Sequence, residues 1–427
     1  MPRNRRSTLS WFPPAELGGP LLAGLAALLA GWAVLAFLPA LHPWLGGDVD
    51  FYANWGTWLA GHRIPYRDFA FEYPPGALPV FTLPPYLRKA FFYVGTYREW
   101  FRVEILVIAA LVLVATAWTL VRLGASRRRA YAALLLVGLA PVVLGPISVS
   151  RYDYWPALFA AAGVAALVSG RGVLSCALLA AGAVVKVWPI VLAPLALLEL
   201  WRRRGRRGVI EGLTAGVLVL AVGFGPFLML GSHGLTWAVH RQIARPLQVE
   251  SLGSAFFAAA HVLAGTRVTT LNSHGSDNVV GHWPDIVGTL SSVATVLALL
   301  LVYVLYARGR RSDERLVLAC AATVTAYVAF TKVFSPQYLV WLIPLVPLVG
   351  GRVGLRASAL FAGLLALTQV WEPYRYHQYY TTLESWLVAL VLVRDLLMLV
   401  LLGLLVQPLL SSERHSEQFD RRRAAVL

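Results

Sequence analysis

Long apolar runs recur through almost the whole chain, and this repetition constrains its fold more than any other feature. The 427 residues are 58% hydrophobic and only 14% charged, a balance typical of polytopic membrane proteins. A helix needs about 20 apolar residues to cross a bilayer. We therefore expect one all-α integral membrane domain over 1–427. Its clearest predicted spans are 20–41, 101–122, 130–148, 152–169, 209–231, 284–306 and 385–406.

The net charge of +16 could suggest nucleic-acid binding, but the placement of the basic residues indicates membrane topology. Short arginine runs alternate with the apolar runs, as expected for cytoplasmic loops. We predict a multi-pass protein of the plasma membrane with both ends cytoplasmic, an uncleaved signal anchor at the start and a basic cytoplasmic tail over 407–427. The basic runs lie at 3–6, 127–129, 202–207, 308–311 and 421–423.

Two apolar stretches require a different reading, because each would place an arginine cluster on the wrong side if it were one span. Residues 172–200 are interrupted at "KVWP" and residues 315–350 at "KVFSP". Read as hairpins, both return the chain to the cytoplasm. The total is then about 12 transmembrane helices, with a last hairpin of 357–371 and 385–406. The predicted outer segments are a long first loop over 42–100, a turn at 148–153, and 232–283 and 372–384.

The chain has three lysines, and all of them fall on the predicted outer side: Lys89, Lys186 and Lys332. Lys186 and Lys332 occupy the two hairpin tips. Short, proline-interrupted segments in matching positions often mark a site at the membrane boundary. The simpler alternative is that these lysines only reach toward the polar interface.

The first outer loop begins with two acids in the stretch "GGDVDFYANWGTWLAGHRIPYRDFAFEYPPGALPVF" at 46–81. Asp48 and Asp50 follow the first apolar run, near the outer surface. An acid in that position can act as a general base on an acceptor hydroxyl, or it can bind a cation. Helix capping in a solvated loop is the alternative interpretation.

The same loop is unusually aromatic, with Tyr66, Phe69, Phe71 and Tyr73 close together. Such residues suit either a membrane-interface belt or the apolar face of a sugar ring. The "YPPG" step predicts a short helix over 76–87 that lies on the membrane or dips into it.

Further charged residues lie in the other outer segments. Arg151 and Asp153 share a turn, where an ion pair between them would explain both. His240, Arg241 and Arg245 form an outward basic cluster, against the positive-inside trend. Because arginine matches phosphate geometry, an anionic lipid head group would explain this cluster; scattered interfacial charge is the alternative.

Several kinds of site find no support in the sequence. The acids and histidines of "NSHGSDNVVGHWPD" at 272–285 match no zinc spacing, and we expect no metal and no cofactor. Cys176 and Cys320 lie inside apolar runs and predict no disulfide. No nucleotide-binding fingerprint is present. If the chain is a transferase, its donor is therefore expected not to be a soluble nucleotide sugar. Arg394 and Asp395, inside the last apolar run, are expected to pair with neighbours.

An acid after the first helix, then "DFY", a "G-x-x-x-PY" step and "YPPG", together resemble the polyprenol-phosphate-sugar-dependent transferases of the GT-C fold. The chain is most similar to the actinobacterial alpha-mannosyltransferase group, glycosyltransferase family 87. The segments "KVWPIVLAPLALL" and "SPQYLVWLIPL" also resemble later parts of that group. The resemblance extends over much of the chain, although its motifs are short.

The resemblance implies inverting transfer of a sugar, mannose in that group, from a polyprenyl-phosphate donor to a glycolipid or glycan acceptor on the outer face. The catalytic acid stands four residues before a tyrosine, which favours Asp48 before Tyr52 and leaves Asp50 as the alternative. Basic outer residues would hold the donor phosphate: Arg151, Lys186, Arg241, Arg245 and Lys332. We assign sugar or acceptor binding to Tyr52, Tyr66, Glu72, Tyr73, Asp153, Trp188 and Gln337.

Two other functional classes remain open from the sequence. A transporter or flippase for a lipid-linked sugar would use the same basic and aromatic groups, but it would need polar groups along a path across the membrane. A non-catalytic scaffold of envelope synthesis would not need acids at the bilayer boundary. The sequence does not identify the sugar, the acceptor or the linkage.

Overall fold

The computed structural model describes residues 15–38, 41 and 48–424, and side chains for 18–38, 41 and 48–410. The predicted inward-facing start, with its basic run at 3–6, lies outside these residues, as do the side chains of the run at 421–423. The described chain is helical, with one small sheet. Its first half contains α1 (Ala15–Phe37), α2 (Val49–Ala60), α3 (Leu78–Ala90), α4 (Tyr97–Arg122), α5 (Arg127–Leu144), α6 (Tyr154–Val168) and α7 (Gly172–Val185).

The second half begins with the long helix α8 (Ala193–Ile243), in which Gly205 and Gly231 have non-helical backbone angles. These two breaks divide α8 into a hairpin arm, a longer middle segment and a short C-terminal segment. The remaining elements are β1 (Leu247–Gln248), α9 (Leu252–Ala264), β2 (Thr270–Ser273), β3 (Ser276–Val279), α10 (His282–Arg308), α11 (Asp313–Phe330), α12 (Gly351–Trp371), α13 (Tyr376–Thr382) and α14 (Ser385–Ala424).

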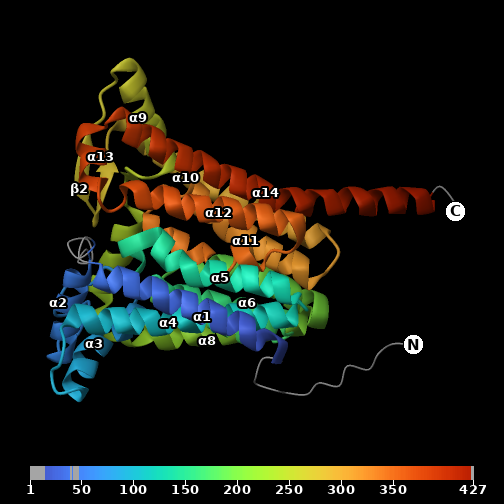
Figure 1. The fold of residues 1–427 in the computed structure, drawn as a ribbon, viewed down its shortest axis with the longest axis horizontal. Helices are drawn as coiled ribbons and strands as arrows, with labels where there is room; N and C mark the ends of the chain where they lie inside the picture. Colours follow the sequence, from blue (N-terminus) through green and yellow to red (C-terminus); the bar gives the residue numbers. More distant parts are fainter. Residues whose placement is uncertain (1–14, 39–40, 42–47, 425–427) are drawn as a thin grey trace.

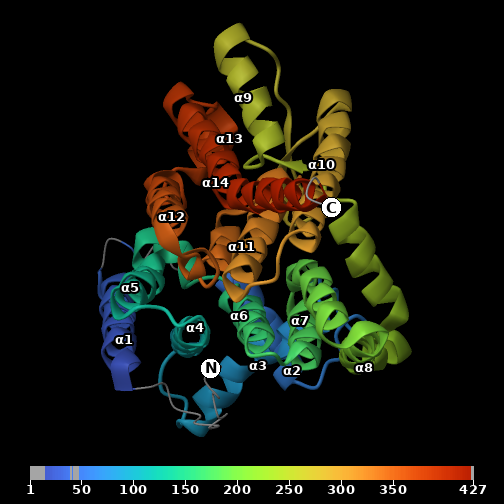
Figure 2. The ribbon, with the colours of Figure 1, turned by 90° about the vertical axis from the view of Figure 1, so that its right-hand side faces the viewer.

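The helices form two groups that pack side by side. Helix α1 packs on α5, α4 on α6, and α6 and α8 on α7, while α11 and α12 pack on α14 and α10 on α11. Contacts of α12 with α5 and of α11 with α6 join the groups (Figure 2). One apolar core runs through both, so the helices bury a common interior.

Within the described residues, seven helical segments are long and apolar enough to span a membrane. Four other apolar segments are shorter: 154–168, 172–185, 252–264 and 336–348. A multi-pass membrane protein is therefore indicated, whereas the expected number of about 12 spans stays a prediction.

Both interrupted apolar stretches do turn at the predicted motifs. Helix α7 ends at Val185, directly before Lys186, and α11 ends at Phe330, two residues before Lys332. After the second break the chain forms short 3-10 turns at Pro336–Leu342 and Val346–Leu348 rather than a full helix. Prolines explain this difference, because each removes a backbone donor and clashes with the preceding turn.

The first outer loop contains the expected short helix, which runs over Leu78–Ala90 as α3 after a 3-10 turn at Pro75–Ala77. The sheet, in contrast, was not expected. Strand β3 pairs antiparallel with both β1 and β2. Figure 1 shows α2, α3, β2 and α13 gathered at one end of the bundle, opposite the end where the C-terminal part of α14 extends. We call the first of these the loop end and the second the α14 end.

Candidate active site

The structure separates the two acids that the sequence left as alternatives. Asp48 directly precedes α2, and its Oδ2 lies 3.3 Å from Nη1 of Arg151. Asp50 lies on the outer surface of α2, where Arg98 donates three hydrogen bonds of 2.6–2.9 Å to it. Successive helical positions differ by about 100° in direction, so acids two residues apart point to different sides. Only Asp48 faces the other predicted site residues.

Arg151 lies largely buried in the turn between α5 and α6, with 17% of its side chain exposed. Burial alone would lower its pKa, but the negative groups around it, Asp48 first, raise the value overall. An ion pair between Arg151 and Asp153, which the sequence left open as the simpler alternative, is not what the structure shows. The carboxylate that pairs with Arg151 is Asp48, so this turn is tied to the first outer loop.

Asp153 instead pairs with the lysine at the first hairpin tip. Its side chain is 1% exposed, and its Oδ1 accepts hydrogen bonds of 2.7 Å from both Lys186 Nζ and Trp341 Nε1. The Lys186 ammonium also lies 5.1–5.4 Å from the ring centres of Tyr152, Tyr338 and Trp341. Burial lowers the pKa of Lys186, and Asp153 opposes that shift. Lys186 is thus held inside the protein by one carboxylate and three aromatic faces, which excludes simple snorkelling.

An aromatic stack lies beside this pair. Trp188 stacks on Trp341 with ring centres 4.8 Å apart, and Trp341 stacks on Tyr338 at 3.9 Å. Trp188 is only 2% exposed, so its ring packs within the core beside the site. Gln337 is half-buried at the start of the adjacent 3-10 turn.

The tyrosines of the first loop are packed rather than free. Tyr52 is 1% exposed and stacks on Phe81 with ring centres 4.4 Å apart. Tyr73 meets Tyr152 edge to face at 5.2 Å. Tyr66 is 5% exposed, and its hydroxyl donates to the carbonyl of Tyr73. Of these tyrosines, the half-buried Tyr73 is the most exposed.

The outward basic cluster divides in the structure. Arg241 Nε lies 2.8 Å from Glu72 Oε1, so these two predicted ligand-binding residues neutralise each other. Arg245 makes one long bond of 3.4 Å to Gln242, and its charge acts on the pKa of Lys186 and of Tyr73.

At the second hairpin tip, Lys332 donates to the carbonyl of Ile243 at 2.9 Å, and burial followed by Arg245 lowers its pKa. Lys186, Arg245 and Lys332 therefore form a cationic group at the loop end.

Sequence reasoning missed two acids of this end. Glu250 follows β1 and is 2% exposed, and Glu372 follows α12 and is 7% exposed. Burial raises the pKa of Glu372 to about 7, with Arg151 and Arg394 acting against the shift and Asp48 adding to it. Each is a lone carboxyl beside an apolar segment, which is the signal that could have identified it. Arg394 lies next to Glu250, since it packs on Phe334 and donates to the backbone carbonyl of Glu250.

Many buried polar atoms at this end have no hydrogen-bond partner in the part of the chain that the structure describes. Proteins rarely leave such atoms unpaired, because each costs about 1–3 kcal/mol. Their concentration around Asp48 and Arg151 indicates a place for a polar ligand or water. These atoms include Arg151 Nε, Tyr152 Oη, Asp153 Oδ2, Arg245 Nε, Gln248 Oε1, Glu250 Oε1 and Glu372 Oε2.

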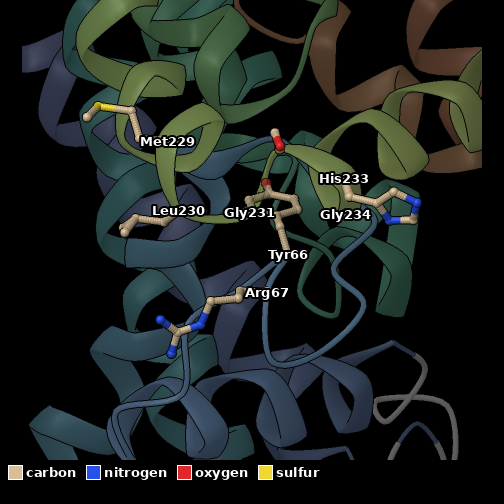
Figure 3. A pocket seen from close by; sticks show the side chains of 8 residues that line it. Tyr66, Arg67, Met229, Leu230, Gly231, His233 and Gly234 are labelled. Atoms are coloured by element: carbon tan, nitrogen blue, oxygen red, sulfur yellow. The ribbon is translucent and has the colours of Figure 1, made fainter.

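A separate open pocket of about 330 Å³ lies where α8 bends at Gly231 (Figure 3). The first outer loop approaches α8 closely there. A Cβ on Gly234 would lie 1.9 Å from the Tyr66 carbonyl oxygen, so only glycine fits at that position. Arg67 and His233 also line this pocket. The loop that begins at Asp48 therefore packs against α8 beside this pocket.

Comparison with known protein families assigns this chain. The family model described as Glycosyltransferase family 87 matches residues 71–336, which is more than half of the chain. The matched part includes Arg151, Asp153, Lys186, Arg245 and Lys332, whereas Asp48, Gln337 and Glu372 lie outside it. A comparison with curated proteins found no match.

Proposed function

The chain belongs to glycosyltransferase family 87, a membrane family of the GT-C type, and from this premise we propose its specific reaction. The protein transfers a sugar, mannose in our proposal, from a polyprenyl-phosphate donor to a glycolipid or glycan acceptor. The transfer inverts the anomeric configuration. The loop end faces the outside of the plasma membrane, and both chain ends are cytoplasmic.

The observation that carries the proposal is the meeting of one half-buried acid with a set of largely buried cations. Asp48 comes from the first outer loop, Arg151 from the next turn and Lys186 from the first hairpin tip. Burying a cation costs desolvation free energy unless its charge is paired with an anion or binds a ligand. A lipid phosphate is a suitable ligand, since it is anionic and accepts several hydrogen bonds.

The chemistry follows from these positions. Asp48 takes the proton of the acceptor hydroxyl as general base. The acceptor oxygen forms a bond to the anomeric carbon while the bond from that carbon to the phosphate oxygen breaks. The electron pair leaves with the phosphate, whose charge Lys186, Arg245 and Lys332 stabilise. A donor phosphate would also compete for Arg151, which would loosen its 3.3 Å contact with Asp48.

A transfer assay tests this proposal. Purified protein in nanodiscs is given radiolabelled polyprenyl-phosphate-mannose and a mixed glycolipid extract. Label should move to a new lipid, and Asp48→Asn should abolish the transfer while donor binding persists. Full transfer by Asp48→Asn would refute Asp48 as the base. Donor binding without transfer by the unmodified protein, across a panel of donor sugars, would favour a flippase.

A further inference from the structure

Two acids at the loop end, Glu250 and Glu372, have no part in the mechanism above. They come from different parts of the chain, since Glu250 lies between β1 and α9 and Glu372 directly follows α12. Both are more than nine-tenths buried. One carboxyl oxygen of each has no hydrogen-bond partner among the described residues.

Gln248 supplies an independent sign of a ligand at the same place. Its Nε2 donates to Glu250 Oε2 at 2.7 Å and to Ser335 Oγ at 2.9 Å. Its own Oε1 is buried and has no partner in the described chain. A neutral amide and two carboxyls therefore present oxygen atoms that nothing in the described protein satisfies. Buried polar atoms of this kind are normally paired with water or ligand.

The charges of the group favour a neutral ligand. Burial and then the charge of Glu372 raise the pKa of Glu250 well above its usual range. Two buried carboxyls that interact in this way are not both ionised. Such a pair can donate and accept hydrogen bonds, as sugar hydroxyls require, and it repels an acid. Among the described residues, no three His, Cys, Asp or Glu side chains are grouped so as to hold a metal ion.

The position of the pair indicates which substrate it meets. Glu372 and Asp48 both act on Arg151, so Glu372 lies on the side of the proposed base. Gln248 donates through its backbone N–H to the carbonyl of Lys332 at 2.9 Å, so Gln248 and Glu250 lie between that side and the cationic group. The cationic group of Lys186, Arg245 and Lys332 is suited instead to the donor phosphate. Since a base must contact the acceptor hydroxyl, a ring beside Glu372 belongs to the acceptor.

We propose that Gln248, Glu250 and Glu372 form an acceptor subsite that binds the hydroxyl groups of an uncharged sugar and rejects acidic sugars. The assignment of the ring to the acceptor rests on the proposed function. The binding of a neutral sugar does not, because it can be measured without turnover.

Saturation-transfer NMR on the protein in nanodiscs tests the subsite with two probes of equal ring size, methyl α-mannopyranoside and anionic methyl glucuronide. The unmodified protein should bind the neutral probe better. Glu372→Ala and Glu250→Ala should weaken that binding roughly three- to tenfold, the loss expected for a hydrogen bond. Glu372→Gln keeps the polar atoms, so it should retain the neutral probe and admit the anionic one more readily.

Glu384→Gln is the matched control, since Glu384 lies at the same end but is bonded to Gln378 and Trp386; it should bind both probes as the unmodified protein does. Unchanged neutral-probe binding in both alanine variants would overturn the subsite. Displacement of the neutral probe by polyprenyl-phosphate-mannose would overturn its assignment to the acceptor. Normal probe binding in a protein that transfers nothing would refute the proposed function and leave the sugar subsite standing.

Discussion

At the α14 end, both carboxylate oxygens of Glu199 are bonded, whereas at the loop end Asp153, Glu250 and Glu372 each keep one buried oxygen without a partner among the described residues. Glu199 accepts from the Tyr306 hydroxyl at 2.6 Å and pairs with Arg311 at 2.8 Å. Both ends are rich in charge, so charge alone does not identify a site. The two ends differ in their buried carboxylate oxygens, because those of Glu199 are all bonded and those of the loop-end acids are not.

The full bonding of the Glu199 carboxylate at the α14 end has a structural explanation. Arg202 reaches across from α8 to carbonyls at the end of α10, and Arg129 pairs with Glu314. These bonds join the α14-end termini of helices that are distant in sequence. At the loop end, buried carboxylate oxygens lack a partner among the described residues, as expected of a site that binds a polar ligand.

The strongest test of this comparison is the removal of Lys186. Lys186→Met should lower transfer roughly 100-fold, the scale for losing one electrostatic contact to a leaving group. It should also destabilise the protein by roughly 3 kcal/mol, because Asp153 would be left as an unpaired buried charge. The nanodisc transfer assay and thermal unfolding measure the two effects. Lys89→Met, on the exposed end of α3, is the control, and equal losses in both variants would contradict the role of Lys186.

Glu199→Ala should affect stability and spare the chemistry. Breaking a buried ion-pair group costs roughly 3 kcal/mol, so the melting temperature should fall. Transfer per folded molecule should stay unchanged, because the site lies at the other end. Thermal unfolding followed by the assay on the folded fraction separates the two. A loss of the acceptor-subsite signal in this variant would break the distinction between the ends.

A pH series distinguishes the ends further. Since burial raises the pKa of Glu372 to about 7, its contribution to stability is complete below its unfolded value near 4.5 and is lost as pH rises through about 7. The expected loss is of order 1–3 kcal/mol. Glu372→Gln should flatten the dependence of melting temperature on pH between 5 and 8. An unchanged profile would show that Glu372 does not titrate in this window.

The smallest effect is expected for Asp50→Asn. Its pair with Arg98 is exposed, 59% and 47% by side chain, and such pairs contribute about 0.2–1 kcal/mol. Transfer should remain near that of the unmodified protein. An activity loss equal to that of Asp48→Asn would reverse the assignment of the base.

Much of the fold could be predicted because each apolar run carries its own signal. The hairpin breaks before Lys186 and Lys332 and the helix after "YPPG" were visible in the sequence for this reason. The β1–β3–β2 sheet was missed because its strands are short and polar. The separate helix expected over 209–231 is one part of α8, since the breaks fall at Gly205 and Gly231.

The site was less predictable, because its ion pairs join residues that are far apart in the sequence. The sequence around Arg151 does not indicate whether this residue pairs with Asp48 or with Asp153. The basic residues near 240 could not be separated either, although Arg241 is neutralised by Glu72 and Arg245 is not. Trp188, expected to contact sugar, lies in a stacked core. The group of Gln248, Glu250 and Glu372 forms only when the two segments that carry these residues meet in the fold.

The close fit of Gly234 against the Tyr66 carbonyl also imposes an order on biosynthesis. The ribosome makes Asp48 and its loop early, but the loop has no docking place until α8 has been translated, more than 150 residues later. Glu372 follows later still. A nascent chain therefore carries its proposed base for most of its synthesis without a complete site around it, and becomes competent only when its last helices insert.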